Sequence, residues 1–212
     1  MCNLYRLNSG PQAILDMTRG MFNQVGNLEP GNVYPDYPAP IVRRASDGTR
    51  ELARARWGMP SPQFAVAGKS FDRGITNVRN TASPHWRRWL GPDSRCLVPA
   101  TAFAEPAPQR DDTGKIPNVW FAIDEEQQPF FFAGIWTRWT GKRKAKEDLA
   151  DHELFAFLTT EPNAVVAPIH KKAMPAILTE PDEIETWLTA PWEEAKALQR
   201  PLADGRLVVS AA

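Results

Sequence analysis

The segment Phe130-Phe-Phe-Ala-Gly-Ile-Trp-Thr-Arg-Trp139 decides the fold. Aromatic and β-branched residues favour the pleated backbone of a strand, so we predict a strand over Phe130–Trp139. An acidic turn joins it to a second predicted strand at Val119–Ile123. Upstream, the apolar run Arg95–Phe103 predicts a buried strand. These neighbouring strands indicate a sheet at the centre of the protein.

Further strands are predicted on either side of this segment. Ile41–Ala45 and Glu51–Trp57 flank the turn sequence Ser46-Asp47-Gly48-Thr49, which is typical of a β-hairpin. Shorter extended segments are predicted at 75–79, 152–159, 176–178 and 207–209.

Helices are predicted to be short. Apolar spacing predicts an amphipathic helix over Pro11–Phe22. Proline in the first turn marks helices starting at Ser83-Pro84 and ending at Leu90, and starting at Pro191 and ending near Leu198. We also expect a helix start over Glu161–Ile169, and a helix over Pro181–Leu188 capped by Thr179.

Strands thus dominate and do not alternate regularly with helices. This order predicts an α+β fold: one domain over residues 1–212, with a mostly antiparallel, curved, barrel-like sheet and short flanking helices.

The composition excludes several classes of protein. Twenty-five basic and 25 acidic residues cancel, so any binding to nucleic acid must use a local patch. No apolar run can span a membrane and no signal peptide is present, which predicts a cytoplasmic protein. Cys2 and Cys96 do not suggest a disulfide framework, and Cys96 lies in an apolar run typical of a buried residue. The histidines and cysteines are widely separated, so we expect no metal and no cofactor.

Cys2 follows the initiator methionine. Removal of Met1 would leave Cys2 with a free α-amine and a thiol on adjacent carbons. Such an aminothiol can attack an aldehyde: the amine forms an imine, and the thiol closes onto the same carbon as a thiazolidine ring. Taken alone, a cysteine at this position is more often one that has no function.

One stretch, Asn77–Trp89, is both basic and aromatic. Its Arg79, Arg87 and Arg88 could neutralise phosphates, and Trp86 could stack on an unpaired base. In the alternative interpretation the tryptophans anchor a short helix in the core and the arginines face solvent. Lys142-Arg143-Lys144 is a second basic run, which we interpret as a solvated loop.

Two titratable residues follow apolar stretches. Glu105 comes directly after a predicted buried strand, where a carboxyl group can have a raised pKa and serve as an acid or base. His170 lies beside Lys171 and Lys172, which would keep its imidazole neutral. The alternatives are a loop glutamate and a structural histidine.

Together these segments resemble the SRAP (SOS response-associated peptidase) family, which includes abasic-site processing proteins. The similarity covers nearly the whole chain and rests on several motifs in order: Met1-Cys2-Asn3-Leu4-Tyr5, Arg56-Trp57-Gly58-Met59-Pro60, Asn77-Val78-Arg79-Asn80-Thr81, Arg95–Ala100, Phe103-Ala104-Glu105-Pro106, Phe132–Trp136 and His170–Pro175. The chain departs from the usual family pattern at Leu4, at Pro62, around Glu105 at Ala104 and Pro106, and by one extra residue after His170.

The resemblance implies a single barrel-like fold that recognises abasic sites in single-stranded DNA and crosslinks to them covalently. It implies that Cys2 is the nucleophile and that Asn77 orients the opened sugar or the cysteine. Glu105 would assist proton transfer, and His170 would act as acid and base near the sugar hydroxyl. Arg79 would hold a phosphate and Lys172 would be a basic contact.

Two other functions remain open at this stage. Cys2 could instead attack a peptide bond, as in a cysteine peptidase or an N-terminal-nucleophile amidohydrolase. The chain could also be a non-catalytic module that binds single-stranded DNA. Under the leading hypothesis we expect a monomer that associates with the nucleoid at damaged DNA. AP-lyase and crosslink-reversal activities are possible additions under the same hypothesis.

Overall fold

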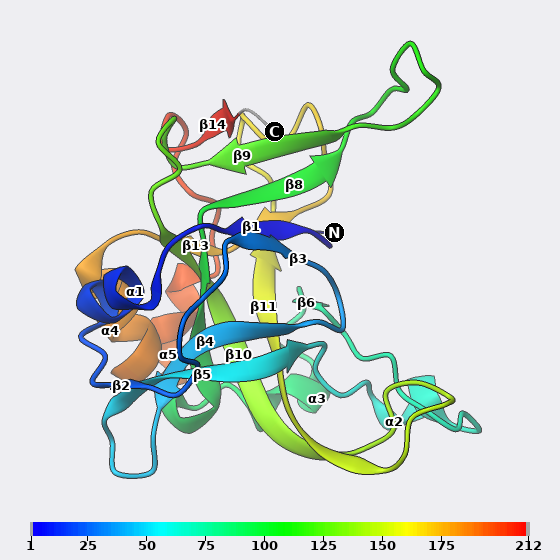
Figure 1. Ribbon diagram of the computed structural model, residues 1–212, viewed down its shortest axis with the longest axis vertical. Helices are drawn as coiled ribbons and strands as arrows, with labels where there is room; N and C mark the ends of the chain where they lie inside the picture. The colour runs from blue at the N-terminus through cyan, green and yellow to red at the C-terminus, as the bar shows by residue number, and fades with distance from the viewer. Residues whose placement is uncertain (1, 211–212) are drawn as a thin grey trace.

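A closed ring of five strands forms the centre of the computed structural model, which describes residues 2–210 (Figure 1). The strands follow one another around the ring in the order β11, β10, β7, β4 and β5, and a parallel pairing of β5 with β11 closes it. All other pairings within the ring are antiparallel. The members are β4 (Pro38–Arg44), β5 (Arg50–Trp57), β7 (Arg95–Ala100), β10 (Phe130–Gly141) and β11 (Ala150–Thr160).

Short strands extend this ring. On β11, β6 (Asn77–Val78) pairs in parallel and β12 (Met174–Pro175) pairs antiparallel. Strand β2 (Phe22–Asn23) pairs with β5, and β13 (Ile177–Leu178) pairs with β10.

A second sheet lies across one end of the barrel, at the top of Figure 1. Its order is β14-β9-β8-β1-β3, and every pairing in it is antiparallel. The strands are β1 (Tyr5–Leu7), β3 (Gly31–Val33), β8 (Ala102–Pro106), β9 (Asn118–Ala122) and β14 (Val208–Ser210). The N-terminal strand therefore lies in the interior of this sheet, between β3 and β8.

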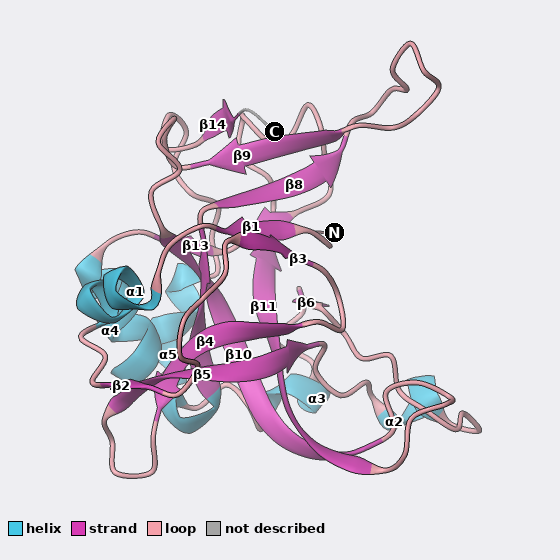
Figure 2. Ribbon diagram, viewed as in Figure 1, coloured by secondary structure: helices cyan, strands magenta, loops and turns pink. Residues whose placement is uncertain are grey.

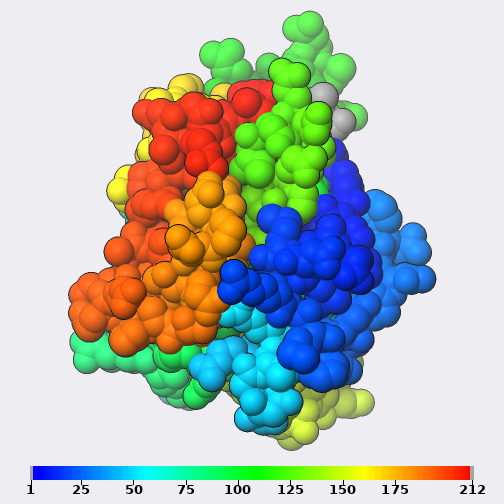
Figure 3. Space-filling model, turned by 90° about the vertical axis from the view of Figure 1, so that its left-hand side faces the viewer, coloured from blue at the N-terminus to red at the C-terminus, as the bar shows by residue number. Residues whose placement is uncertain are grey.

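Helices cover one side of the barrel (Figure 2). Helix α1 (Pro11–Thr18) packs beside α4 (Pro181–Thr189), where blue and orange segments meet in Figure 3, and α4 contacts α5 (Trp192–Ala195). The short α2 (Gln63–Val66) and α3 (Pro84–Arg87) lie on the other side, and 3-10 turns occupy 92–94 and 196–198. Within residues 2–210, none of the helices has the length and apolarity needed to cross a bilayer.

Alternation along the strands divides the core in two. Side chains pointing into the barrel form an aromatic cluster, in which Tyr5 lies 5.2 Å from Trp57 and Phe132 lies 4.5 Å from Phe157 between ring centroids. Side chains pointing outward, such as Phe131, pack beneath the helices. Because successive strand residues face opposite sides, a run such as Phe130–Phe132 is buried on both faces.

The hairpin and the strand centred on Phe130–Trp139 are confirmed, and so is the α+β class with a barrel-like sheet. Arg95–Phe103 is not one strand but two. The chain leaves the barrel at Ala100, and the Thr101 backbone N–H donates to Arg6 O at 2.8 Å, which starts β8 in the second sheet.

Four helix predictions need correction. The first helix ends at Thr18 because Arg19 adopts a left-handed backbone with φ of 52°. Glu161–Ile169 forms turns, since the Asn163 side chain bonds to Leu202 O and to the Val166 N–H instead of leaving them to a helix. The other two concern the cap of α4 and the length of the helix predicted from Ser83.

Thr179 does not cap α4. Glu180 occupies the cap position, and Glu180 and Glu183 bond reciprocally to each other's backbone N–H groups in a capping box. The helix predicted from Ser83 to Leu90 is limited to Pro84–Arg87.

Candidate active site

Strand pairing fixes the position of Cys2. Tyr5 is paired with Phe103 of β8, and the Ala104 N–H donates to Leu4 O at 2.9 Å. Three residues before Tyr5, the Cys2 side chain is 1% exposed and packs on the aromatic cluster inside the barrel. Its Sγ–H donates to Leu4 O at 3.4 Å. Cys2 therefore lies where the second sheet meets the barrel end. Met1 lies outside the described residues.

Asn77 connects the barrel to this cysteine. It pairs with Phe157 of β11, and its Nδ2 donates to Cys2 O at 2.8 Å and to Thr76 Oγ1 at 2.9 Å. Residues 75 positions apart in the chain are thus in direct contact. Because Asn77 is 7% exposed, this bond is made away from bulk water and restricts the cysteine backbone.

Glu105 lies on β8, the strand that pairs with β1, and is 1% exposed. Burial raises the pKa of Glu105, and the charge of His170 opposes that rise. Burial also raises the pKa of the Cys2 thiol, and the nearby Glu105 carboxylate raises it further. The carboxyl group is therefore close enough to both Cys2 and His170 to influence them electrostatically.

His170 is held by a tight turn. Its backbone N–H donates to Val166 O at 2.8 Å, and its ring Nδ1 lies 2.7 Å from Ala173 O and 3.2 Å from Ala173 N. Since the Ala173 backbone engages Nδ1, proton exchange at this ring falls to Nε2. A thiol, a carboxamide, a carboxyl group and an imidazole thus gather at one end of the barrel.

The predicted DNA contacts are placed less uniformly. Arg79 follows Asn77 by two residues and pairs with Glu161 at 3.4 Å. Arg87 ends α3 and Arg88 follows it, and both are exposed, as is Lys172 in the His170 turn.

Trp86 does not fit its predicted role. It is 6% exposed and packs on Trp89 and His85, with ring centroids 5.8 and 4.5 Å away. The prediction that Trp86 stacks on DNA bases is wrong, because the apolar face of this short helix needs the indole as its core anchor.

Arg143 does not lie in solvent, so the interpretation of its basic run as a solvated loop is wrong at this residue. Its side chain is 0% exposed, its Nη2 donates to Arg73 O at 2.7 Å, and its Nε lies 3.4 Å from Asp36 Oδ1. A Cβ at Gly74 would lie 2.5 Å from the guanidinium, and one at Gly58 would lie 2.4 Å from it. Two glycines thus create the space for Arg143, which holds the segment leading to Asn77.

Two further residues, Trp57 and Thr76, support the site. Trp57 Nε1 donates to Thr76 O at 3.0 Å, and Thr76 Oγ1 lies 3.4 Å from Asn3 Oδ1. In the sequence they are marked only by their neighbours, since Trp57 precedes Gly58 and Thr76 precedes Asn77.

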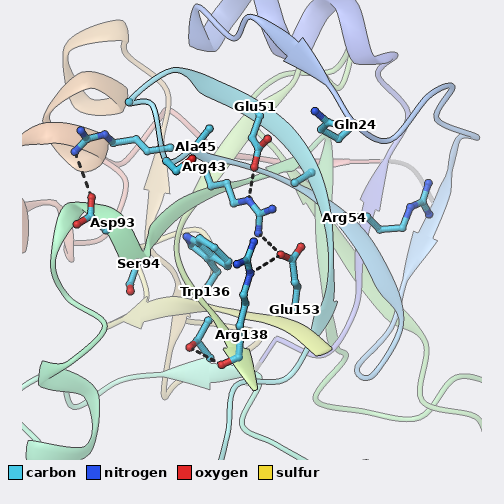
Figure 4. A pocket seen from close by; sticks show the side chains of 15 residues that line it. Gln24, Arg43, Ala45, Glu51, Arg54, Asp93, Ser94, Trp136, Arg138 and Glu153 are labelled. Carbon is cyan, nitrogen blue, oxygen red and sulfur yellow. Dashed lines mark hydrogen bonds and ion pairs between the residues drawn. The ribbon is translucent and has the colours of Figure 1, made fainter. Parts of the chain in front are cut away.

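A separate concavity of about 960 Å³ lies at the opposite mouth of the barrel (Figure 4). There the Arg43 guanidinium lies 4.1 Å from the Trp136 ring centre, 2.8 Å from Glu51 and 3.0 Å from Glu153. Glu51 is near the start of β5, whereas Trp57, at its end, adjoins the Cys2 region. None of the predicted site residues lines this concavity, and its carboxylates are already paired with arginines.

Comparisons with known proteins agree with this architecture. Residues 1–211 match the family described as SOS response associated peptidase (SRAP). A crystal structure of a protein from Bordetella bronchiseptica superimposes with a TM-score of 0.75 at 26% identity, over 100% of this chain and 99% of that one. No curated protein sequence matches the chain.

Two further crystal structures share the fold. A protein from Bacteroides thetaiotaomicron has a TM-score of 0.71 at 24% identity, covering 98% of this chain and 90% of that one. A phage-related protein from Bordetella bronchiseptica has a TM-score of 0.69 at 23% identity, covering 98% and 92%. With a family match over nearly its full length and a barrel shared with these structures, the chain belongs to the SOS response associated peptidase (SRAP) family.

Proposed function

We propose that this protein recognises abasic sites in single-stranded DNA and crosslinks to them through Cys2 after Met1 is removed. One observation carries the proposal. Asn77 fixes the Cys2 backbone at 2.8 Å, while the buried Glu105 influences Cys2 and is itself influenced by His170. A nucleophile thus lies beside two groups that can exchange protons.

The covalent step joins the α-amine and the thiol of Cys2 to one aldehyde carbon. The α-amine of Cys2 adds to the aldehyde carbon of the opened sugar, and loss of water gives an imine. The thiol sulfur then adds to the imine carbon, and its proton passes to the nitrogen. Amine, thiol and aldehyde become a thiazolidine and one water, with no oxidant or reductant.

Proton transfer is the role of Glu105 and His170 in this mechanism. An abasic sugar exists mainly as a closed hemiacetal, so ring opening needs one proton removed and one supplied. Burial raises the pKa of Glu105, which favours its protonated form and allows it to deliver a proton as water leaves. His170, with Nδ1 held by Ala173, exchanges protons at the sugar hydroxyl through Nε2. The same pair would serve strand scission and reversal of the crosslink.

The burial of Cys2 favours delayed activation of its thiol. A raised pKa keeps the sulfur protonated and weakly nucleophilic, so the amine reacts first. Once the imine exists, ring closure is intramolecular and needs little further activation. Arg79, Arg87, Arg88 and Lys172 supply exposed positive charge for the DNA backbone in this proposal.

Crosslinking to a single-stranded oligonucleotide with one abasic site tests the proposal. We expect an adduct that survives heat and denaturant, with a mass equal to the protein without Met1 plus DNA minus one water. Cys2→Ala should abolish it, and Cys96→Ala should retain it because Cys96 is buried inside the barrel. An adduct formed equally well by Cys2→Ala would refute the mechanism.

The family description as a peptidase supports one alternative, in which Cys2 attacks a peptide bond. Turnover of peptide substrates with no adduct on abasic DNA would favour that activity. Salt-dependent DNA binding that ignores both Cys2 and the lesion would indicate a non-catalytic binding module instead.

A further inference from the structure

Two exposed tyrosines lie on the connection between β3 and β4. Tyr34 is 43% exposed and Tyr37 is 56% exposed, and their rings form an edge-on pair with centroids 5.7 Å apart. Most aromatic rings of this chain are buried in its two cores. A pair of contacting rings that remains this exposed therefore offers a surface on which a flat ligand can stack.

The pair is next to the candidate nucleophile. Strand β3 runs antiparallel to β1 with Val33 opposite Tyr5, so the chain beyond Val33 continues alongside the residues that lead back to Cys2. Cys2 precedes Tyr5 by three residues, about 10 Å along an extended strand. Figure 1 shows this connection on the same side of the molecule as β6 and the N-terminal end of β1.

Backbone bonds attach the connection to the site. The Trp57 N–H donates to Tyr37 O at 3.0 Å, and the Asp36 N–H donates to Trp57 O at 2.8 Å. Trp57 in turn holds Thr76 through its ring nitrogen at 3.0 Å. The tyrosines and Asn77 are therefore positioned by the same residue at the end of β5.

Asp36 makes this turn rigid. It adopts a left-handed backbone with φ of 72°, and its carboxylate accepts two bonds of 2.7 Å from Arg56. Lys144 lies 3.1 Å and Arg143 lies 3.4 Å from the same carboxylate. The centre of the turn is thus fixed by several charges while the rings on either side face solvent. A rigid ring loses little conformational entropy when a flat ligand stacks on it.

We propose that Tyr34 and Tyr37 form a stacking subsite for a nucleobase adjacent to the abasic site. The inference rests on the proposed function, because that function brings single-stranded DNA to Cys2. Nucleotides follow one another by about 3.4 Å along a stacked strand, so bases next to the lesion come within reach of the pair. Every base presents a π-face, so this subsite reads the presence of a base and not its identity.

The test compares two oligonucleotides, each with one reactive abasic site. In the first, ordinary nucleotides flank the lesion; in the second, the flanking positions carry tetrahydrofuran spacers, which have no base and no aldehyde. The variants are Tyr34→Ala/Tyr37→Ala, the ring-preserving Tyr34→Phe/Tyr37→Phe, and Phe22→Ala. Phe22 is a matched control, since it is 46% exposed but pairs with Glu51 at the far end of β5.

Stacking is worth about 5- to 150-fold in affinity per base. We expect the double alanine variant to lose affinity for the base-flanked oligonucleotide within that range. Its affinity for the spacer-flanked one, and its crosslinking rate at saturating DNA, should match those of the wild type. The double phenylalanine and Phe22→Ala variants should behave as the wild type on both, and thermal melting confirms that each variant is folded.

Equal weakening of both oligonucleotides by the double alanine variant, or no weakening of either, overturns the stacking subsite. If the wild type binds but forms no adduct, the proposed function fails, and fluorescence anisotropy with the same oligonucleotides still decides on stacking. If the wild type binds neither oligonucleotide at low salt, both proposals fall.

Discussion

Gly74→Ala is the sharpest perturbation that the structure offers, because it acts on the packing that holds the candidate site and spares every candidate catalytic side chain. Gly74 has a left-handed backbone with φ of 76°. An added Cβ would lie 2.5 Å from the Arg143 guanidinium and 2.8 Å from Gly58 O. The guanidinium is buried and bonded to Arg73 O, and the second contact is backbone, so neither can move away freely.

The expected loss of stability in Gly74→Ala has two contributions. A left-handed conformation costs a residue with a Cβ about 1–2 kcal/mol. Overpacking at a site that cannot relax adds about 1–3 kcal/mol. The expected loss of about 2–5 kcal/mol corresponds to a fall in Tm of roughly 4–20 °C for a chain of this length.

Thermal unfolding of Gly74→Ala and Gly68→Ala separates these contributions. Gly68 has a nearly identical φ of 75°, but a Cβ there would meet nothing within 4 Å. Gly68→Ala should therefore show only the conformational cost, a fall of roughly 2–8 °C. Equal changes in Tm for the two variants would refute the conclusion that Arg143 fills the space beside Gly74.

Three further predictions concern buried and charged side chains. Trp86→Ala should lower the free energy of unfolding in urea by about 3–5 kcal/mol because it empties a core position. The exposed Arg87→Ala should change that free energy by under about 0.5 kcal/mol. It should also reduce the slope of log affinity for single-stranded DNA against log salt concentration by about 0.7. Burial raises the pKa of Glu105, so the folded state binds the carboxyl proton more tightly than the unfolded state. The stability from this proton is lost as pH rises from about 4. The Tm of Glu105→Gln should therefore improve relative to the wild type with rising pH, and a difference in Tm that stays constant with pH would contradict this prediction. Burial raises the pKa of Asp36, but bonding to Arg56 and Lys144 outweighs burial and lowers it. The carboxylate therefore stabilises the fold above its unfolded pKa, and this stability is lost as pH falls through the folded pKa. Asp36→Asn should lower Tm at pH 7, and its difference from the wild type should shrink as pH falls below about 4.

Patterns that depend on nearby residues were predictable from the sequence. The hairpin around Asp47-Gly48 and the aromatic strand at Phe130 follow from local turn chemistry and strand preference, and both are confirmed. The failures arose where tertiary contacts override local preference. Glu161–Ile169 carries the signals of a helix start, yet the Asn163 side chain bonds the backbone of Leu202 and Val166 and holds the segment in turns.

The candidate site shows the same limit more sharply. Cys2, Glu105 and His170 could be singled out for their chemistry, but their grouping with Asn77 could be proposed only because several motifs together resemble a family. No spacing along the chain predicts that β1 pairs with β8 while Asn77 of β6 bonds to the Cys2 backbone. Arg143 could not be distinguished from its neighbours Lys142 and Lys144 by sequence, because all three are basic residues in a charged loop. The distinction depends on Gly58 and Gly74, which lie 85 and 69 positions upstream and leave a space that only one of the three side chains enters. The two glycines therefore indicate which basic residue is buried only when the contact between the two segments is known. The same argument explains why Asp36 matters: its charge fixes the turn that presents Tyr34 and Tyr37, and its cationic partners come from β5 and from the β10–β11 loop.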